Sequence, residues 1–137
     1  MNESLAGYRE IEHTADWELA CWATDLPALL EQAARGMYAL SETQLAPGPR
    51  QVIEIDLPAA DPESLLVAFL SELLWLADQE RLGFDTFQIT IQADRMAARM
   101  EGAPVESQTK TIKAATYHNL KIVQTRWWVE ASVVFDV

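Results

Sequence analysis

The sequence is poor in the residues and motifs that most enzyme classes need. It has one cysteine in 137 residues, which excludes an internal disulfide and a cysteine-rich zinc site. It contains no phosphate-binding glycine-rich loop, and none of its serines lies in a nucleophile-elbow motif. Its two histidines, His13 and His118, have no cysteine beside them at metal-binding spacing. These absences leave few signs of catalysis.

The chain also lacks long apolar runs and an excess of positive charge. No apolar run approaches the roughly 18 residues that a membrane helix needs, and residues 1–5 lack the basic start and apolar core of a signal peptide. We therefore expect a cytoplasmic protein. Ten basic residues stand against 21 acidic ones, for a net charge of −11. Because an acidic surface repels phosphates, we expect no direct nucleic-acid binding. A basic protein or a metal cation suits this charge better, although plain solubility also explains it.

Apolar residues are abundant and regularly spaced. Half of the residues are hydrophobic, and the length fits one domain, so we assign residues 1–137 to a single domain. Apolar side chains recur at helical spacing over residues 26–40, and Thr24-Asp25-Leu26-Pro27 supplies a capping side chain and then a proline in the first turn. They recur again from Leu65 to Leu74, after Asp61-Pro62-Glu63. These signals predict two helices, the second ending near residues 81–83.

Most of the remaining chain alternates apolar and polar residues as strands do. In the final strand, Asp136 falls on the face opposite a row of alternating side chains: Trp127, Val129, Ala131, Val133 and Phe135. Residues 102–110 are polar and irregular. Two helices among many strands predict an α+β fold, with the two helices packed on one face of a largely antiparallel β-sheet. The predicted strands and extended segments are residues 8–12, 17–22, 51–57, 87–91, 96–101, 111–118, 120–124 and 127–135.

Two carboxylates are adjacent in the last residues, the side chain of Asp136 and the main-chain carboxyl group of Val137. A divalent cation would cancel their repulsion, and oxygen ligands suit calcium or magnesium better than zinc. Asp16 precedes an apolar strand, where an aspartate is disfavoured unless it caps, hydrogen-bonds or binds something. If both ends of the domain meet, Asp16, Asp136 and Val137 form a candidate cation site. The alternatives are an Asx-turn at Asp16 and a solvated strand end at Asp136.

A third stretch, residues 112–118, reads Ile-Lys-Ala-Ala-Thr-Tyr-His. Lys113 is a lone cation in an extended, apolar context. It either extends its charge from a sheet face into solvent or meets an acidic partner or a phosphate. His118 is either a structural histidine or a functional one, and the sequence offers no third group to complete a catalytic triad with it.

Three stretches together resemble the archease family. They are residues 8–16, which end in His13-Thr14-Ala15-Asp16, residues 112–118, and Phe135-Asp136-Val137. Between them, residues 26–40 resemble the family's first helix, with an Ala-x-x-Gly-Met element, and residues 61–76 resemble its leucine-rich second helix. His-Thr-Ala-Asp alone is a weak signal, but three motifs in order over nearly the whole chain are specific.

The resemblance implies an accessory protein rather than an enzyme. Archeases promote guanylylation of the GTP-dependent tRNA-splicing RNA ligase at its catalytic histidine and support multiple turnover, so it implies that ligase as partner and a role in tRNA splicing and RNA repair. It also implies a divalent cation bound by Asp16, Asp136 and Val137. Calcium is the first choice, with magnesium or manganese as alternatives. The family motifs make Lys113, His13 and His118 further candidate functional residues.

The sequence departs from the family pattern before the Lys-Ala motif. Many archeases have a Gly-Glu pair followed by a histidine there, whereas this chain has Gly102-Ala103 between Glu101 and Glu106. Asn119 follows the Thr-Tyr-His element where many members have glycine, and we expect it to serve a turn because asparagine tolerates positive φ.

Two other functions use the same features. One is a small metal-dependent hydrolase, in which the carboxylates hold a cation that activates water. The other is a chaperone-like modulator of an RNA-modifying enzyme such as a tRNA methyltransferase.

Overall fold

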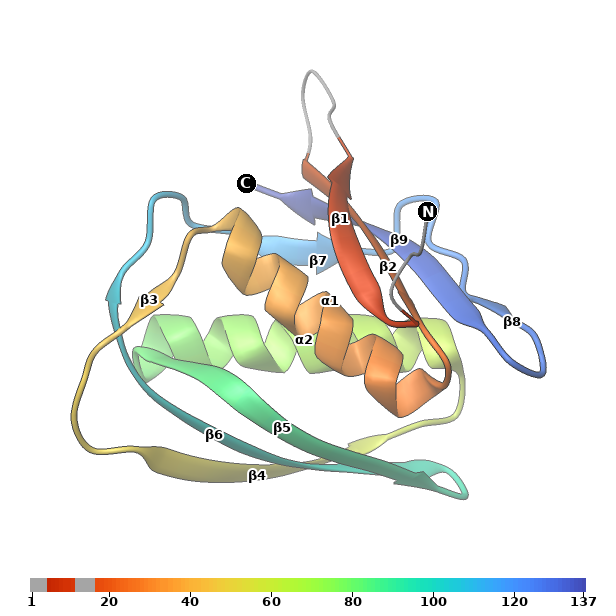
Figure 1. Cartoon of the computed structure of the whole chain (residues 1–137), viewed down its shortest axis with the longest axis horizontal. Helices are drawn as coiled ribbons and strands as arrows, with labels where there is room; N and C mark the ends of the chain where they lie inside the picture. The colour runs from red at the N-terminus through yellow and green to blue at the C-terminus, as the bar shows by residue number, and fades with distance from the viewer. Residues whose placement is uncertain (1–4, 12–16) are drawn as a thin grey trace.

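Two antiparallel β-sheets enclose two helices in the computed structural model, which describes residues 5–11 and 17–137 (Figure 1). The five-stranded sheet contains β1 (Gly7–Ile11), β2 (Trp17–Ala23), β9 (Val129–Asp136), β7 (Ala114–Thr116) and β8 (Val123–Gln124). The four-stranded sheet contains β3 (Gln44–Leu45), β6 (Arg95–Ser107), β4 (Gln51–Pro58) and β5 (Leu82–Gln92).

Both helices begin where their capping residues predict. In α1 (Leu26–Leu40), the Asp25 side chain accepts a hydrogen bond from the Ala28 N–H at 2.9 Å. In α2 (Pro62–Gln79), Asp61 accepts one from the Ser64 N–H at 2.7 Å. An aspartate cap followed by a proline in the first turn satisfies free N–H groups and sets φ for the helix. The second helix ends slightly before the predicted residues 81–83.

The helices form a layer between the two sheets. α1 contacts β1, β2 and β9 on one side and β5 on the other, and α2 contacts β7 on one side and β4 and β5 on the other. This confirms the predicted α+β class, with two helices and antiparallel strands. The strands divide between two sheets, a detail that depends on which strands pair and that alternation within each strand does not specify. Neither helix in the described part is both long enough and apolar enough to cross a membrane.

The close approach of α1 to the five-stranded sheet depends on Gly36. A Cβ atom at this position would lie 2.5 Å from Cδ2 of Leu19, which is fully buried in β2. The missing side chain therefore lets the helix lie directly on the strand. This explains the glycine of the Ala-x-x-Gly-Met element by packing.

Some of the predicted strands are wrong in extent. β6 continues to Ser107, through the stretch predicted to be irregular, because its residues up to Pro104 pair with β5 and Val105 and Ser107 pair with β3. The extended segments around residues 111–124 contain only the short strands β7 and β8. Trp127 is not on the buried face of the last strand: it precedes β9 and is 73% exposed.

Candidate functional site

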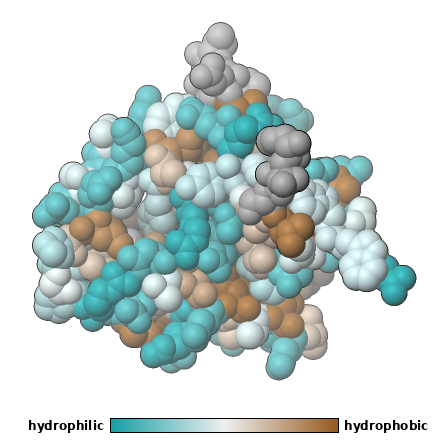
Figure 2. Space-filling view, viewed as in Figure 1, coloured by the Kyte–Doolittle hydropathy of each residue, from teal (hydrophilic) through white to brown (hydrophobic). Residues whose placement is uncertain are grey.

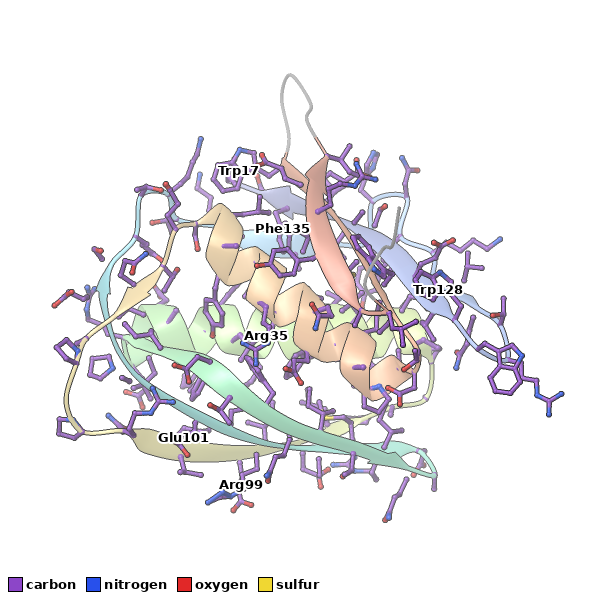
Figure 3. All side chains as sticks on the ribbon, in the orientation of Figure 1. Trp17, Arg35, Arg99, Glu101, Trp128 and Phe135 are labelled. Atoms are coloured by element: carbon purple, nitrogen blue, oxygen red, sulfur yellow. The ribbon has the colours of Figure 1, made fainter. Side chains whose placement is uncertain are left out.

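Strand β9 lies in the middle of the five-stranded sheet and positions the last residues of the domain. It pairs with β2 on one side and with β7 and β8 on the other. At its far end, Phe135 pairs with Trp17 of β2 and with Ala115 of β7. Figure 3 shows Trp17 and Phe135 at the same end of the sheet. Trp17, the residue after Asp16, therefore lies beside the end of β9.

Asp136 is exposed at this strand end. Phe135 is fully buried, and the alternation of β9 places Asp136 on the opposite face of the sheet, as predicted. The main-chain oxygen of Asp136 accepts a hydrogen bond from the N–H of Lys113 at 2.8 Å. No ion pair to its carboxylate is present among the described residues. Its oxygens are therefore not neutralised by a lysine or arginine of that part of the chain.

Val137 is half-buried, and its side chain packs against the hydrophobic core. This contact holds the residue after Asp136 against the domain. If a main-chain oxygen of Val137 binds a cation, the packing of the Val137 side chain would hold that oxygen in place.

His13 and Asp16 lie outside the described residues. Their predicted roles, and the complete set of Asp16, Asp136 and Val137, stay predictions. Within residues 5–11 and 17–137, no three side chains of His, Cys, Asp or Glu are grouped so that they could hold a metal ion. The predicted site needs Asp16 and a main-chain carboxyl group, so this finding does not decide it.

The backbone of Lys113 is hydrogen-bonded to that of Asp136, and the exposed Lys113 also lines a groove. The groove has a volume of about 590 Å³ and runs between α2 and residues 108–114. Trp75, which is 54% exposed, and Arg81 also line it. In the described part of the chain, Lys113 makes no side-chain ion pair. Its charge is therefore available to a partner.

His118 lies in a turn after β7. Its N–H donates to Oγ1 of Thr116 at 3.2 Å, and Asn119 has φ of +53°, which confirms the predicted turn role of the asparagine. Ala114 of β7 pairs with Asp136, and His118 is four residues further along. β7 runs antiparallel to β9 and leads away from Asp136, since Thr116 pairs with Val134. Among the described residues, no hydrogen bond or ion pair joins the side chains of His118 and Asp136.

The position of the family's Gly-Glu pair lies in the interior of β6. Ala103 is fully buried, where a small apolar residue avoids the cost of burying a carboxylate. A Cβ on Gly102 would lie 1.8 Å from the main-chain oxygen of Gly83. The neighbouring Glu101 forms an ion pair with Arg50 at 3.2 Å. The departure from the family pattern thus fits the local packing.

Sequence reasoning missed the environment of Trp17. The Nζ atom of Lys110 lies 5.1 Å from the centre of the Trp17 ring, within the range of a cation–π interaction. The two residues are far apart in the sequence, so no local pattern could have signalled this contact. It ties residues 107–113 to the strand that follows Asp16.

Comparisons with known proteins agree over almost the whole chain. The model of the Archease protein family matches residues 8–137. Protein archease of Methanosarcina barkeri is 32% identical over 143 residues, covering 95% of each chain. Protein archease of Thermococcus gammatolerans is 28% identical over 134 residues, covering 90% of this chain and 94% of the relative.

Solved structures give the same agreement in three dimensions. The solution structure of protein 1598 from Methanobacterium thermoautotrophicum has a TM-score of 0.71 and 25% identity, and covers 96% of this chain and 99% of that one. A crystal structure of an archease from Thermotoga maritima, described as a possible chaperone, has a TM-score of 0.70 and 22% identity, with 94% and 96% covered. Both share the fold described above.

Proposed function

Because this chain belongs to the archease family, we propose that it is an accessory activator of the GTP-dependent tRNA-splicing RNA ligase. In this role it promotes guanylylation of the ligase and supports multiple turnover, without a reaction of its own. The observation that carries the proposal is the exposed carboxylate of Asp136, fixed on the central strand β9 at its junction with the start of β2, which directly follows Asp16.

The residues at this junction fit a divalent cation. Asp136 offers oxygen atoms without a cationic partner in the described part of the chain. Asp16 is bonded to Trp17, whose partner across the sheet is Phe135, the neighbour of Asp136. We propose that Asp16, Asp136 and Val137 hold the ion. Calcium is the preferred candidate, and magnesium and manganese are the alternatives. When bound, the ion supplies positive charge that attracts anionic groups of the partner.

The chain's own residues have distinct parts in this proposal. Phe135 and Val137 pack into or against the core, which fixes Asp136 between them. The backbone of Lys113 holds the main-chain oxygen of Asp136, and its side chain presents a positive charge at the groove beside α2. Such packing holds a binding group in one orientation before the partner arrives.

The net charge of −11 supports docking on a basic enzyme. A protein that binds RNA presents positive charge to it, and an acidic accessory protein would be attracted to the same enzyme. Attraction of this kind speeds association more than it slows dissociation.

A hydrolase built on the same carboxylates would need a general base near Asp136. β7 leads away from Asp136 before it reaches His118, and His13 lies outside the described residues, so the described residues place no histidine base beside Asp136 and favour an accessory role. The Thermotoga maritima relative is described as a possible chaperone, and a chaperone-like role would also act through protein contact. The experiment below separates a specific effect on the ligase from general protection of an enzyme.

The test measures guanylylation and repeated ligation by limiting cognate ligase, with and without this protein. We expect stimulation by the natural chain and its loss on Asp136→Ala, because the cation site loses a ligand. Glu54→Ala is the matched control, since Glu54 is an exposed carboxylate on β4 of the other sheet. Circular dichroism should show the same fold for both variants.

The absence of stimulation at any ratio would contradict the proposal. Equal stimulation by the natural chain and by Asp136→Ala would show that activation does not pass through this site. Protection of an unrelated enzyme from aggregation, without any effect on guanylylation, would favour the chaperone-like role instead.

A further inference from the structure

The positive charge of this acidic protein is concentrated in one segment. Residues 107–129, called the acid-free segment below, contain four of the ten basic residues and none of the 21 acidic ones. They also contain Tyr117, Trp127 and Trp128. A whole-molecule charge of −11 hides this local excess, because charges further apart than about 8 Å are largely screened at physiological ionic strength.

The acid-free segment is held against the domain, so its exposed side chains have a defined position. Ile112, Ala115 and Ile122 are buried. The N–H of Ile122 donates to the Glu63 carboxylate at the start of α2 at 2.9 Å. The turn between β8 and β9 is closed by the Thr125 N–H, which donates to the main-chain oxygen of Trp128 at 2.8 Å.

The turn between β8 and β9 carries an exposed aromatic side chain beside a cation. Trp127 is 73% exposed, and the guanidinium carbon of Arg126 lies 4.9 Å from the centre of its ring. Figure 1 shows this turn projecting from the body of the molecule, and the surface in Figure 2 likewise protrudes on that side. An exposed indole with a guanidinium beside it offers an aromatic face and a positive charge to the same partner.

A hollow lies next to this turn, on the outer face of the five-stranded sheet. Its volume is about 450 Å³, within the range of about 300–1,000 Å³ that is usual for ligand pockets. Ala20 and Ser132, which pair across β2 and β9, line it with small side chains. Trp22 and Trp128 line it as well.

The two indoles of the hollow are held by specific contacts. The ring of Trp22 packs over Gly7, where a Cβ atom would lie only 2.6 Å from it. The indole N–H of Trp128 donates to the Glu130 carboxylate at 3.3 Å, and Figure 3 shows Trp128 beside β9 and β8. Arg9 and Lys121 also line the hollow, and neither forms an ion pair within the described residues. Glu130 is the one carboxylate that lines the hollow in this part of the chain.

We propose that this hollow and the β8–β9 turn form a binding surface for single-stranded nucleic acid. Bases would stack on Trp127 and in the hollow beside Trp128, and phosphates would pair with Arg9, Lys121 and Arg126. Aromatic platforms interleaved with cations are the usual means of binding single strands without sequence preference. An acidic peptide would account for the cations but would gain little from the exposed indoles. This inference does not rest on the proposed ligase activation.

The first test measures binding of the chain alone to a short fluorescein-labelled oligouridylate, by fluorescence anisotropy at several salt concentrations. With three phosphate contacts, log K should fall with log salt with a slope of about −2. Trp127→Ala should weaken binding roughly 5-fold or more, because stacking of one base is lost. Lys121→Ala should reduce the slope by about 0.7.

Matched controls lie elsewhere on the molecule. Trp75 is also an exposed tryptophan, on α2, and Arg99 is an exposed arginine on β6, far from Trp128 in Figure 3. Neither Trp75→Ala nor Arg99→Ala should change binding. All four side chains are more than a third exposed, so their removal should leave the fold intact.

Three results would overturn the proposal. These are no change in anisotropy at low salt, equal losses on Trp127→Ala and Trp75→Ala, or displacement of the oligonucleotide by polyglutamate as readily as by unlabelled oligouridylate. The last result would assign the surface to an acidic protein partner. None of them bears on stimulation of the ligase, which is measured separately.

Discussion

Cys21 shows how burial controls the chemistry of a single residue. Its side chain is 1% exposed in β2, and burial raises the pKa of the thiol from 9.0 to about 12. The thiolate is the reactive form of cysteine, so this cysteine should be inert in the folded protein. An aromatic disulfide reagent should give no signal from the native chain near neutral pH and one equivalent after denaturation. Fast reaction of the native chain would contradict the buried position.

The same residue affects stability in alkali. Because the folded chain holds the thiol proton more tightly, the unfolded chain loses it first as pH rises above about 9. The free energy of unfolding should therefore be unaffected below that pH and fall between about 9 and 12, by at most about 1.4 kcal/mol per unit. Burial also raises the pKa of Tyr38, so both groups lower the stability at high pH. The share due to Cys21 is the part of this pH dependence that disappears in Cys21→Ala, measured by urea unfolding. An identical pH dependence in the variant would contradict this assignment.

At the scale of elements, α1 and β2 meet through Gly36 and Leu19. Alanine at position 36 gains roughly 1 kcal/mol of helix propensity but must push aside a fully buried leucine, which costs about 1–3 kcal/mol. We expect Gly36→Ala to destabilise the natural chain by about 1 kcal/mol. In a Leu19→Ala background the same change should stabilise, because the clash with Leu19 is gone and only the partly exposed ring of Tyr8, 3.0 Å from the added Cβ atom, has to shift. Denaturant unfolding of the natural chain, the two single variants and the double variant measures the effect of Gly36→Ala on the free energy of unfolding in each background. An effect of the same sign in both backgrounds would show that Leu19 is not the obstacle.

Strand β9 gives a prediction about the predicted cation ligand at Val137. One residue added after Val137 moves the terminal carboxyl group away, whereas one added before Met1 does not. Calorimetric titration with calcium should show weaker binding for the first variant only. Equal affinities would mean that the carboxyl group of Val137 is not a ligand, while Asp136 could still be tested by substitution.

The elements that could be predicted are those with signals inside their own sequence. Asp25 and Asp61 mark the helix starts, and alternation correctly places Phe135 inside and Asp136 outside. The division into two sheets could not be predicted, because it depends on pairings such as Leu19 with Val133 that join distant residues.

The candidate site shows the same limit. Asp136 and Lys113 were both singled out from local motifs, and their backbone contact was not foreseen. Trp127 was predicted on a buried face because the alternation extends one step past the strand start; the turn at residues 125–128 interrupts it. The cation–π contact of Lys110 with Trp17 has no sequence signal at all.

At the scale of the whole molecule, charge is distributed unevenly. The acid-free segment carries four of the ten basic residues, of which Lys121 lines the hollow and Arg126 lies in the β8–β9 turn, and the rest of the chain carries all 21 acidic residues. An acidic body and a basic segment can meet two different partners at once. If both proposals hold, the body contacts the ligase and the hollow contacts RNA.

This distribution predicts a salt effect on activation. The rate at which the protein associates with the proposed ligase partner should fall steeply with rising salt, and the dissociation rate should change little, since long-range attraction acts mainly on the encounter. Stopped-flow fluorescence measures both rates, with equal-viscosity sucrose as the control for slower diffusion. An association rate independent of salt would show that the acidic surface does not guide docking.

The pairing of β2 with β9 also has a consequence for how the protein is made. Residues 17–23 pair with residues 129–135, and contacts between such distant residues form slowly because a long loop must close first. During synthesis, β1 and β2 therefore stay without their neighbour until β9 has left the ribosome. The junction that holds Asp136 is assembled only by that last step, so an interrupted chain cannot present it. Competence to activate a partner would thus report that folding of the five-stranded sheet is complete.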